Sequence, residues 1–416
     1  MLKRLKIKNY RVFDKEIVID FTANMHIKRL MANTIQDSNQ NILKTLCIYG
    51  PNNTGKTCLV LALRAIRTIM LNEMHEEFSN AFLDDDVTNI SVEFIINKTN
   101  YLYEAEYNSK MRIYIKEELS IIQFNSINNQ QTRKIKVFDR ANSIINIIDH
   151  VNDKPKRLII NNIANEYPVM KALNFDSNYL SKIQKDYIAF ASSIEIVLSE
   201  HGIDLSKTLD LIRNDEKGLK FVKSFVRNCD LKINDFGYSE TITSDVDIDD
   251  KIALMNPYIS KEPLKLWSQH DKYKVPSFIF DSIGTQKIIA LSGYIYDAIK
   301  NGKILIIDEL DSSLHHIISR ALVSIFNNYL NDKSQLVFTT HDVALMDLIH
   351  LFRKDQIYLT DIDNENNIIV RHLLDNYGSR DIDGVRGTED IKDFYIKGRF
   401  KGIPTPDLYD SVYGDE

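Results

Sequence analysis

Apolar residues alternate with polar ones in two N-terminal parts of the chain. Over residues 1–21 this alternation predicts two antiparallel strands joined at 9–14, which form an edge hairpin. Over residues 89–119 a longer alternating series, broken by short polar turns, predicts an antiparallel β-meander. The polar segment 22–41 is expected to be a loop. The N-terminal part should therefore contain an antiparallel sheet.

A different pattern lies between these two regions. Residues 42–49 are mostly apolar without regular alternation, which is typical of a short strand buried on both faces. Residues 58–66 then begin a helix of roughly 15–20 residues, expected to end near 72–76. The sequence therefore predicts a buried strand, a short connecting loop and a helix in direct succession.

Buried strands and helices alternate again after residue 276. A helix over 288–299 precedes an apolar strand at 303–307. A second helix, expected to reach about residue 329, precedes an apolar strand at 336–340. The tail, 353–416, alternates briefly and then becomes polar and acidic. This alternation of strands and helices predicts an α/β fold.

The middle of the chain carries no recognisable chemistry. Helical apolar spacing recurs over 169–199 and 205–229, and no heptad repeat is sustained long enough for a coiled-coil arm. We therefore expect three parts: a first lobe at 1–122, a mostly helical insertion or lid at 123–275, and a second lobe with the tail at 276–416.

The loop between the first buried strand and its helix matches a phosphate-binding pattern. It reads Gly50-Pro51-Asn52-Asn53-Thr54-Gly55-Lys56-Thr57, which fits G-x-x-x-x-G-K-S/T at every position. Backbone amides and the helix N-terminus would surround the phosphates, Lys56 would reach the β- and γ-phosphates, and the Thr57 hydroxyl would bind Mg²⁺. The alternative is a chance match on a turn that contains glycine, and the flanking strand and helix argue against it.

Two carboxylates follow the apolar strand at 303–307. Asp308 is placed to hold Mg²⁺ through water, and Glu309 to polarise an attacking water molecule. The alternative is an ordinary acidic strand end. The phosphate-binding loop in the same chain favours the catalytic interpretation, and the sequence thus predicts an ATP and Mg²⁺ site.

Composition and charge restrict the setting. No segment approaches the length of a membrane span, the N-terminus lacks a signal peptide, and three cysteines without metal-ligand spacing favour a reducing, cytoplasmic compartment. Between residues 110 and 157, ten Lys and Arg face five Asp and Glu, although the whole chain has a net charge of −6. This local surplus is either a solvated face or a contact for nucleic-acid backbone or an acidic partner.

The order of these motifs resembles the ABC-type ATPases, in particular their RecF/SMC and OLD-like branch. A phosphate loop, S-x-G-T, an apolar strand ending in Asp-Glu, D-x-S-L-H and a strand ending in histidine follow one another. The resemblance implies that Ser282, Gly284 and Thr285 form the signature motif that meets the partner's nucleotide. It implies that Asp311 lies in the D-loop at the dimer interface and that His341 reads the γ-phosphate. The signature departs from the usual L-S-G-G-Q, and Gln123 is the nearest candidate for the Q-loop.

Three segments also resemble bacterial AAA ATPase domain family 15. They are the N-terminal L-K-I-K-N-Y-R-V-F, the segment 225–236 and the closing 393–404, D-F-Y-I-K-G-R-F-K-G-I-P. Members of that family recur as ATPase components of bacterial antiphage and abortive-infection systems. The resemblance implies an ABC-type ATPase head whose mixed sheet is joined to an antiparallel β-subdomain.

Three functions follow as alternatives. The first is a cytoplasmic, Mg²⁺-dependent switch ATPase that dimerises head-to-tail around ATP and controls a separately encoded effector in phage defence. The second is a RecF-like DNA-repair or DNA-clamp ATPase, so a contact with DNA stays open. The third is an OLD-type nuclease, for which the candidate motif is the D-x-D at 361–363. Too little chain follows this D-x-D for a nuclease domain, and we expect a polar turn there.

Overall fold

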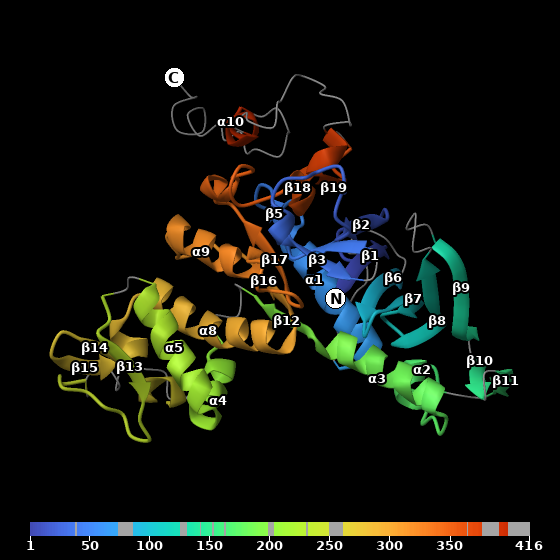
Figure 1. The fold of residues 1–416 in the computed structure, drawn as a ribbon, viewed down its shortest axis with the longest axis horizontal. Coiled ribbons are helices and arrows are strands. Elements are labelled where there is room, and N and C mark those ends of the chain that lie inside the picture. The colour runs from blue at the N-terminus through green and yellow to red at the C-terminus, as the bar shows by residue number, and fades with distance from the viewer. Residues whose placement is uncertain are drawn as a thin grey trace, which may run out of the picture.

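The computed structural model describes residues 1–37, 40–73, 86–124, 131–141, 143–151, 154–161, 164–198, 204–229, 232–248, 261–363, 365–376 and 391–397. These residues form two large sheets with helices between and around them (Figure 1). A third, small sheet lies apart from both, at one end of the molecule.

The main sheet has six strands and carries the predicted site. Its order is β12 (Ile194–Val197), β16 (Ile304–Ile307), β17 (Gln335–Thr340), β5 (Thr45–Tyr49), β18 (Ile357–Ile362) and β19 (Ile368–His372). Neighbouring strands from β12 to β18 are parallel, and only β19 is antiparallel. The carboxyl ends of β5, β17 and β16 therefore lie side by side at one edge, where ligands of open α/β sheets bind.

The second sheet is antiparallel and has eight strands. Its order is β11 (Lys154–Ile160), β10 (Ile144–Val151), β9 (Gln131–Ala141), β8 (Ile113–Phe124), β7 (Thr99–Asn108), β6 (Val87–Ile96), β1 (Leu2–Lys8) and β2 (Ile17–Asp20). The N-terminal hairpin and the meander expected from the alternating pattern are both present. They join through the β1–β6 pairing.

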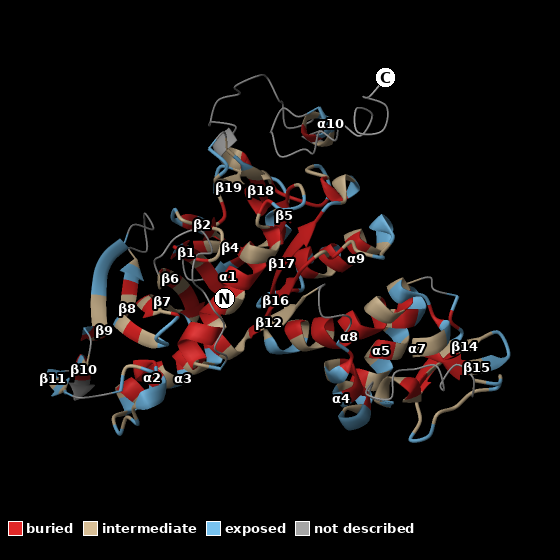
Figure 2. Cartoon of the chain, turned by 180° about the vertical axis from the view of Figure 1, so that it is seen from behind, coloured by how far each residue is buried: buried red, intermediate tan, exposed pale blue. Residues whose placement is uncertain are grey.

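Helix α1 (Lys56–Leu71) lies between the two sheets, and most of its side chains are buried (Figure 2). One buried cluster contains α1, α3 (Asn178–Ser192), residues of β1, β6 and β7, and one face of the main sheet. The other face of the main sheet is covered by α8 (Ile283–Asn301) and α9 (His316–Asn327). This layered arrangement is the expected α/β fold with a mixed sheet and an antiparallel β-subdomain, which is confirmed.

The remaining elements surround this core. Helices α4 (Ser206–Asn214) and α5 (Glu216–Asn228) pack on α8 beside the small sheet of β13 (Asp235–Tyr238), β14 (Leu266–His270) and β15 (Tyr273–Pro276). The others are β3 (Thr34–Asp37), β4 (Gln40–Leu43), α2 (Val169–Ala172), α7 (Ser277–Phe280) and α10 (Ile391–Ile396), with the short 3-10 helices η1 (Met31–Asn33), η2 (Glu262–Lys265), η3 (Val343–Leu345), η4 (Lys354–Gln356) and η5 (Leu373–Asn376).

The expectation of a mostly helical insertion at 123–275 needs correction. In the described part of this range, β9, β10 and β11 extend the antiparallel sheet, and β12 joins the main sheet. The apolar positions Phe190, Ile194 and Leu198 had the spacing of one helix, but α3 ends at Ser192 and the alternating I-E-I-V pairs with β16. The boundary after residue 122 also falls inside β8. The segment 22–41, expected to be a loop, contains the strand β3, which pairs with β4.

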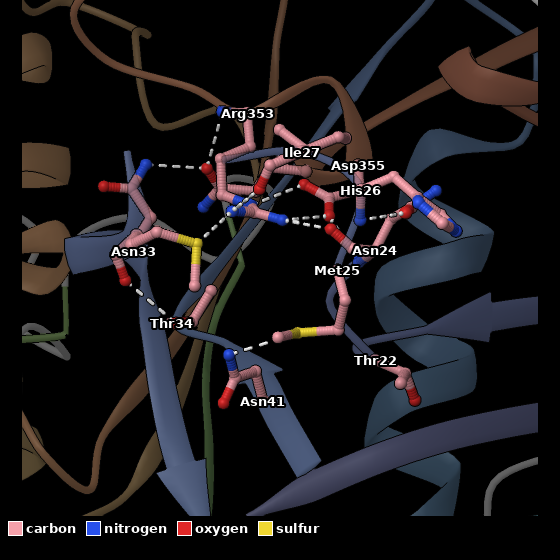
Figure 3. A network of polar contacts seen from close by, with 12 residues as sticks. Thr22, Asn24, Met25, His26, Ile27, Asn33, Thr34, Asn41, Arg353 and Asp355 are labelled. Atoms are coloured by element: carbon pink, nitrogen blue, oxygen red, sulfur yellow. Dashed lines mark hydrogen bonds and ion pairs between the residues drawn. The ribbon is translucent and has the colours of Figure 1, made fainter. Parts of the chain in front are cut away.

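A buried arginine fixes the segment that precedes β3. Arg353, whose side chain is fully buried, donates two hydrogen bonds to the Asp355 carboxylate, at 2.9 and 2.7 Å. It also donates to the carbonyl oxygens of Asn24 and Ile27, at 2.9 and 3.0 Å (Figure 3). The same pair stands immediately before β18, so one ion pair attaches residues 24–27 to the main sheet.

Candidate functional site

The predicted phosphate loop follows β5 and ends where α1 begins. Gly55 caps α1 with a φ of 83°, a left-handed conformation that suits glycine. At the start of the loop, a Cβ on Gly50 would lie 2.0 Å from the Thr360 Oγ1 of β18. The Thr54 hydroxyl donates to the Pro51 carbonyl at 2.7 Å and shares a 2.7 Å hydrogen bond with Thr360. The glycines of the motif are therefore required by close approach and by backbone conformation.

Lys56 is turned into this loop. Its Nζ donates to the carbonyl oxygens of Gly50 and Pro51, at 2.9 and 2.6 Å. Burial lowers the pKa of the Lys56 ammonium, against the opposing charges of three carboxylates, those of residues 308, 309 and 311. The ammonium is thus held at the loop, while the side chains of Asn52 and Asn53 at the tip are exposed.

Asp308 meets the loop from the end of β16. Its Oδ2 accepts a 3.0 Å hydrogen bond from the Thr57 hydroxyl, and its Oδ1 accepts one of 2.6 Å from Thr339 on β17. Thr57 and Asp308, 251 residues apart in the sequence, are therefore neighbours. A hydroxyl and a buried carboxylate at one sheet edge are the oxygen ligands that Mg²⁺ prefers, so the two residues fit the predicted metal site.

Glu309 is held by its main chain. Its amide donates to the Thr339 hydroxyl at 2.7 Å, and its φ of 51° lies in the left-handed region. Such a conformation costs a non-glycine residue of order 1–3 kcal/mol and persists only where its surroundings impose it. The side chain is partly exposed. A turn with a left-handed backbone therefore carries Glu309 at the end of β16.

Asp311 and His341 come together at the same edge. The Asp311 Oδ2 accepts a 3.2 Å hydrogen bond from the His341 amide, which follows β17. Burial lowers the pKa of the His341 imidazole, and the Lys56 charge lowers it further, whereas Asp311, Glu309 and Asp308 oppose the shift. His341 therefore lies within electrostatic reach of the phosphate loop.

The predicted signature residues begin α8. The Ser282 Oγ caps the helix by accepting from the Thr285 amide at 3.2 Å, and the two hydroxyls share a 3.0 Å hydrogen bond. A Cβ on Gly284 would lie 2.3 Å from the Ser313 carbonyl oxygen, so the helix start packs directly on the turn after Glu309. Among the described residues, no hydrogen bond or ion pair joins Ser282, Gly284 or Thr285 to the phosphate loop of the same chain.

Sequence reasoning missed three residues that support the site. Thr339 and Thr360 lie within apolar strands, where the pattern gives them no function, and Lys287 is one of many lysines. Position near a strand end was the available signal for Thr339. The Q-loop candidate Gln123 is exposed at the end of β8, and its carbonyl oxygen accepts from Thr132. No described contact brings Gln123 to the phosphate loop.

The fold and this site define a P-loop nucleotide-binding protein of the α/β class. The chain belongs to the family described as "AAA domain, putative AbiEii toxin, Type IV TA system", which matches residues 46–347. That range includes the phosphate loop, the signature residues, Asp308, Glu309 and His341. The terminal segments compared above with AAA ATPase domain family 15 lie outside it, so that narrower resemblance stays an interpretation.

Solved structures of SMC head domains are also similar to the chain. An SmcHead bound to the C-winged helix domain of ScpA has 12% identity and a TM-score of 0.47, with 89% of this chain and 98% of that chain covered. The SMC head domain from Thermotoga maritima has 12% identity, a TM-score of 0.40 and the same coverage. An Smc head domain with an extended coiled coil, bound to the C-terminal domain of ScpA derived from Pyrococcus furiosus, has 11% identity and a TM-score of 0.46, covering 90% and 97%. The comparison with curated proteins finds no match.

Two absences concern the described residues only. None of their helices combines the length and the apolar character that crossing a membrane requires. They also contain no group of three or more His, Cys, Asp or Glu side chains arranged for a metal ion. The candidate Mg²⁺ site of Thr57 and Asp308 is of another kind, since phosphate oxygens and water complete such sites.

Proposed function

We propose that the chain is a Mg²⁺-dependent ABC-type switch ATPase. The observation that supports this most strongly is the contact between the Thr57 hydroxyl and the Asp308 carboxylate. It joins the predicted phosphate loop to the predicted catalytic strand at one sheet edge, beside Lys56 and Glu309. Membership of a P-loop ATPase family supports the same conclusion.

Each residue has a distinct role in this proposal. The loop amides and the Lys56 ammonium bind the β- and γ-phosphates. Thr57 and Asp308 hold Mg²⁺, which neutralises phosphate charge when it is bound. Glu309 orients and deprotonates the attacking water, and His341 faces the γ-phosphate.

Completion of the site requires a second copy of the chain. Ser282, Gly284 and Thr285 lie at the start of α8 without a described contact to their own phosphate loop. Each chain has one loop and one signature, so a two-fold head-to-tail homodimer would complete two sites at once. In this arrangement Asp311 crosses the dimer interface. ATP closes the dimer, and hydrolysis reopens it.

The biological output we propose is control of a separately encoded effector in phage defence, in the cytoplasm. The family description refers to an AbiEii toxin of a type IV toxin–antitoxin system. The resemblance to antiphage ATPase components supports the same setting. Because fold alone does not determine such a role, identification of a copurifying effector tests this part of the proposal.

The alternative of a DNA clamp receives less support from the basic region at 110–157. Lys116 is paired with Glu106, and Lys134 with Glu104. Lys136 is paired with Glu118, which also accepts from Lys134. Part of the positive surplus is therefore neutralised within the sheet, as expected of a solvated face. The D-x-D of the nuclease alternative also favours a turn, since the Asp363 carboxylate accepts from the amides at positions 365 and 367.

Replacement of Glu309 by Gln tests the proposed chemistry. We expect Glu309→Gln to bind ATP and to lower kcat by about 10²–10⁴-fold, because an amide cannot accept the proton of water. The variant should accumulate as an ATP-bound dimer on size-exclusion chromatography, and the effector should copurify with it. Glu216→Gln is the matched control, because it makes the same change at an exposed carboxylate on α5, outside the proposed site. Turnover of Glu309→Gln within a few-fold of wild type would remove Glu309 from the mechanism.

A further inference from the structure

Lys287 lies on α8, five residues after Ser282, and no motif gives it a role. Its Nζ donates a 2.7 Å hydrogen bond to the Glu309 carbonyl and one of 3.0 Å to the Ser312 carbonyl. The side chain is half-buried. Burial lowers the pKa of its ammonium, while Asp311, Glu309 and Asp308 favour the charged form. One lysine therefore bridges the two ends of the turn that carries Glu309.

The turn that Lys287 bridges is strained. Glu309 has a φ of 51° and Ser313 a φ of 61°, and both lie in the left-handed region. A non-glycine residue keeps such a conformation only where contacts from outside the turn impose it. From β17, Thr339 contributes two of these contacts, to the amides of Glu309 and Leu310, at 2.7 and 3.0 Å. Lys287 contributes its two contacts from α8.

The start of α8 also touches this turn directly. A Cβ atom on residue 284 would lie only 2.3 Å from the Ser313 carbonyl oxygen. Because Gly284 has no Cβ, this oxygen can contact the start of α8. The signature helix and the Glu309 turn are in contact at Gly284 and hydrogen-bonded through Lys287. We therefore expect them to move as one body. Interfaces packed this closely transmit small shifts and do not absorb them.

We infer that Lys287 is a positioning residue that fixes the Glu309 turn to the signature helix. This inference rests on the proposed function, and it adds a consequence for the dimer. The helix that meets the partner's nucleotide also sets the position of Glu309 in its own site. Occupancy of one site is thereby coupled to catalysis in the other.

The test compares Lys287→Met with Lys287→Arg and with Lys300→Met. Lys287→Met keeps the length of the side chain and removes its donors, and we expect kcat to fall about 10–100-fold, the scale of a misplaced catalytic group. The Kd for ATP should stay within about twofold of wild type, because the phosphate loop is untouched. Lys287→Arg retains charge and donors and should recover part of kcat. Lys300→Met, near the far end of α8, is the matched control and should behave as wild type.

A double-mutant cycle with Glu309→Gln separates positioning from general loss of structure. If Lys287 acts through Glu309, adding Lys287→Met to Glu309→Gln lowers turnover no further. The inference would be overturned if the losses in kcat of the two single variants multiplied in the double variant. It would also be overturned if Lys287→Met had a wild-type kcat, or if Lys287→Arg were no faster than Lys287→Met. If Lys287→Met does not fold, Lys287→Arg enters the same cycle.

Hydrogen exchange distinguishes failure of this inference from failure of the proposed function. The amides of residues 309–313 should exchange faster in Lys287→Met than in the wild type. In Lys300→Met their exchange rates should equal those of the wild type. Unchanged exchange in Lys287→Met overturns the positioning role whether or not the chain hydrolyses ATP. If Lys287→Met exchanges faster but the wild-type protein does not hydrolyse ATP, the proposed ATPase function is refuted. The effect of Lys287 on catalysis is then refuted as well.

Discussion

The Lys56 ammonium is held inside the phosphate loop. It donates to two loop carbonyls, those of Gly50 and Pro51. In the proposed ATP complex, phosphate oxygens would replace these acceptors, and binding would then require little ordering of the lysine. Fixed donors of this kind reduce the entropy that a ligand must offset. The loop is therefore preorganised for phosphate, because its positive charge is fixed inside it.

The same charge affects His341, and this gives a prediction for the free protein. Burial and the Lys56 ammonium both disfavour the imidazolium, so His341 should titrate below its ordinary pKa of 6.5. Lys56→Met removes the repulsion and keeps the carboxylates, so the pKa of His341 should rise. Titration of ¹³C-labelled histidines by NMR measures the change, with Lys300→Met as the control. A pKa that stays constant or falls in Lys56→Met would show that Lys56 and His341 do not interact.

The sequence predicted the residues that belong to motifs and missed those that position them. Asp308 and Thr57 could be proposed because their spacing from strand, loop and helix follows the motifs, and the structure brings the two side chains together. Thr339, by contrast, binds both Asp308 and Glu309, and such a contact depends on β17 lying between β5 and β16. Strand order is a property of the whole fold, and one sequence does not reveal it.

At the scale of elements, the Arg353–Asp355 pair should stabilise the connection before β3. Arg353→Met would leave the Asp355 carboxylate buried without its partner, at a cost of about 3–5 kcal/mol in the free energy of unfolding. Urea denaturation measures this loss. Arg320→Met, which removes a more exposed ion pair with Asp347, should cost less than about 1 kcal/mol. Equal losses in the two variants would contradict a special role for the buried pair.

Elements with a strong local pattern were predicted well, and elements that depend on distant partners were not. The helix α1 and the meander of β6, β7 and β8 appear where expected, whereas the single strand expected at 42–49 is divided between the end of β4 and β5. The strand β12 has four residues and exists because β16 pairs with it. Ile194 fitted the spacing of the preceding helix, and local periodicity could not separate the two possibilities.

At the scale of the whole molecule, the two halves of the proposed site belong to different regions. The phosphate loop follows β5 at the carboxyl edge of the main sheet, whereas the signature begins a helix that follows α7 beside the small sheet and runs from there toward β16 (Figure 1). The one described connection between the signature helix and the catalytic turn runs through Gly284 and Lys287 within the same chain. Assembly is therefore the central claim: a single chain binds ATP, and two chains hydrolyse it.

Mixing two inactive variants tests that claim most directly. Lys56→Ala should abolish nucleotide binding, and Ser282→Arg should bind ATP without hydrolysing it. A mixed dimer has one intact composite site, so an equimolar mixture should reach up to about a quarter of wild-type ATPase activity, since half of the dimers are mixed and each has one of two sites. Activity is measured across mixing ratios at constant total protein. The account predicts a maximum near equal amounts. Full activity of Ser282→Arg alone, or a mixture no more active than its separate components, would contradict it.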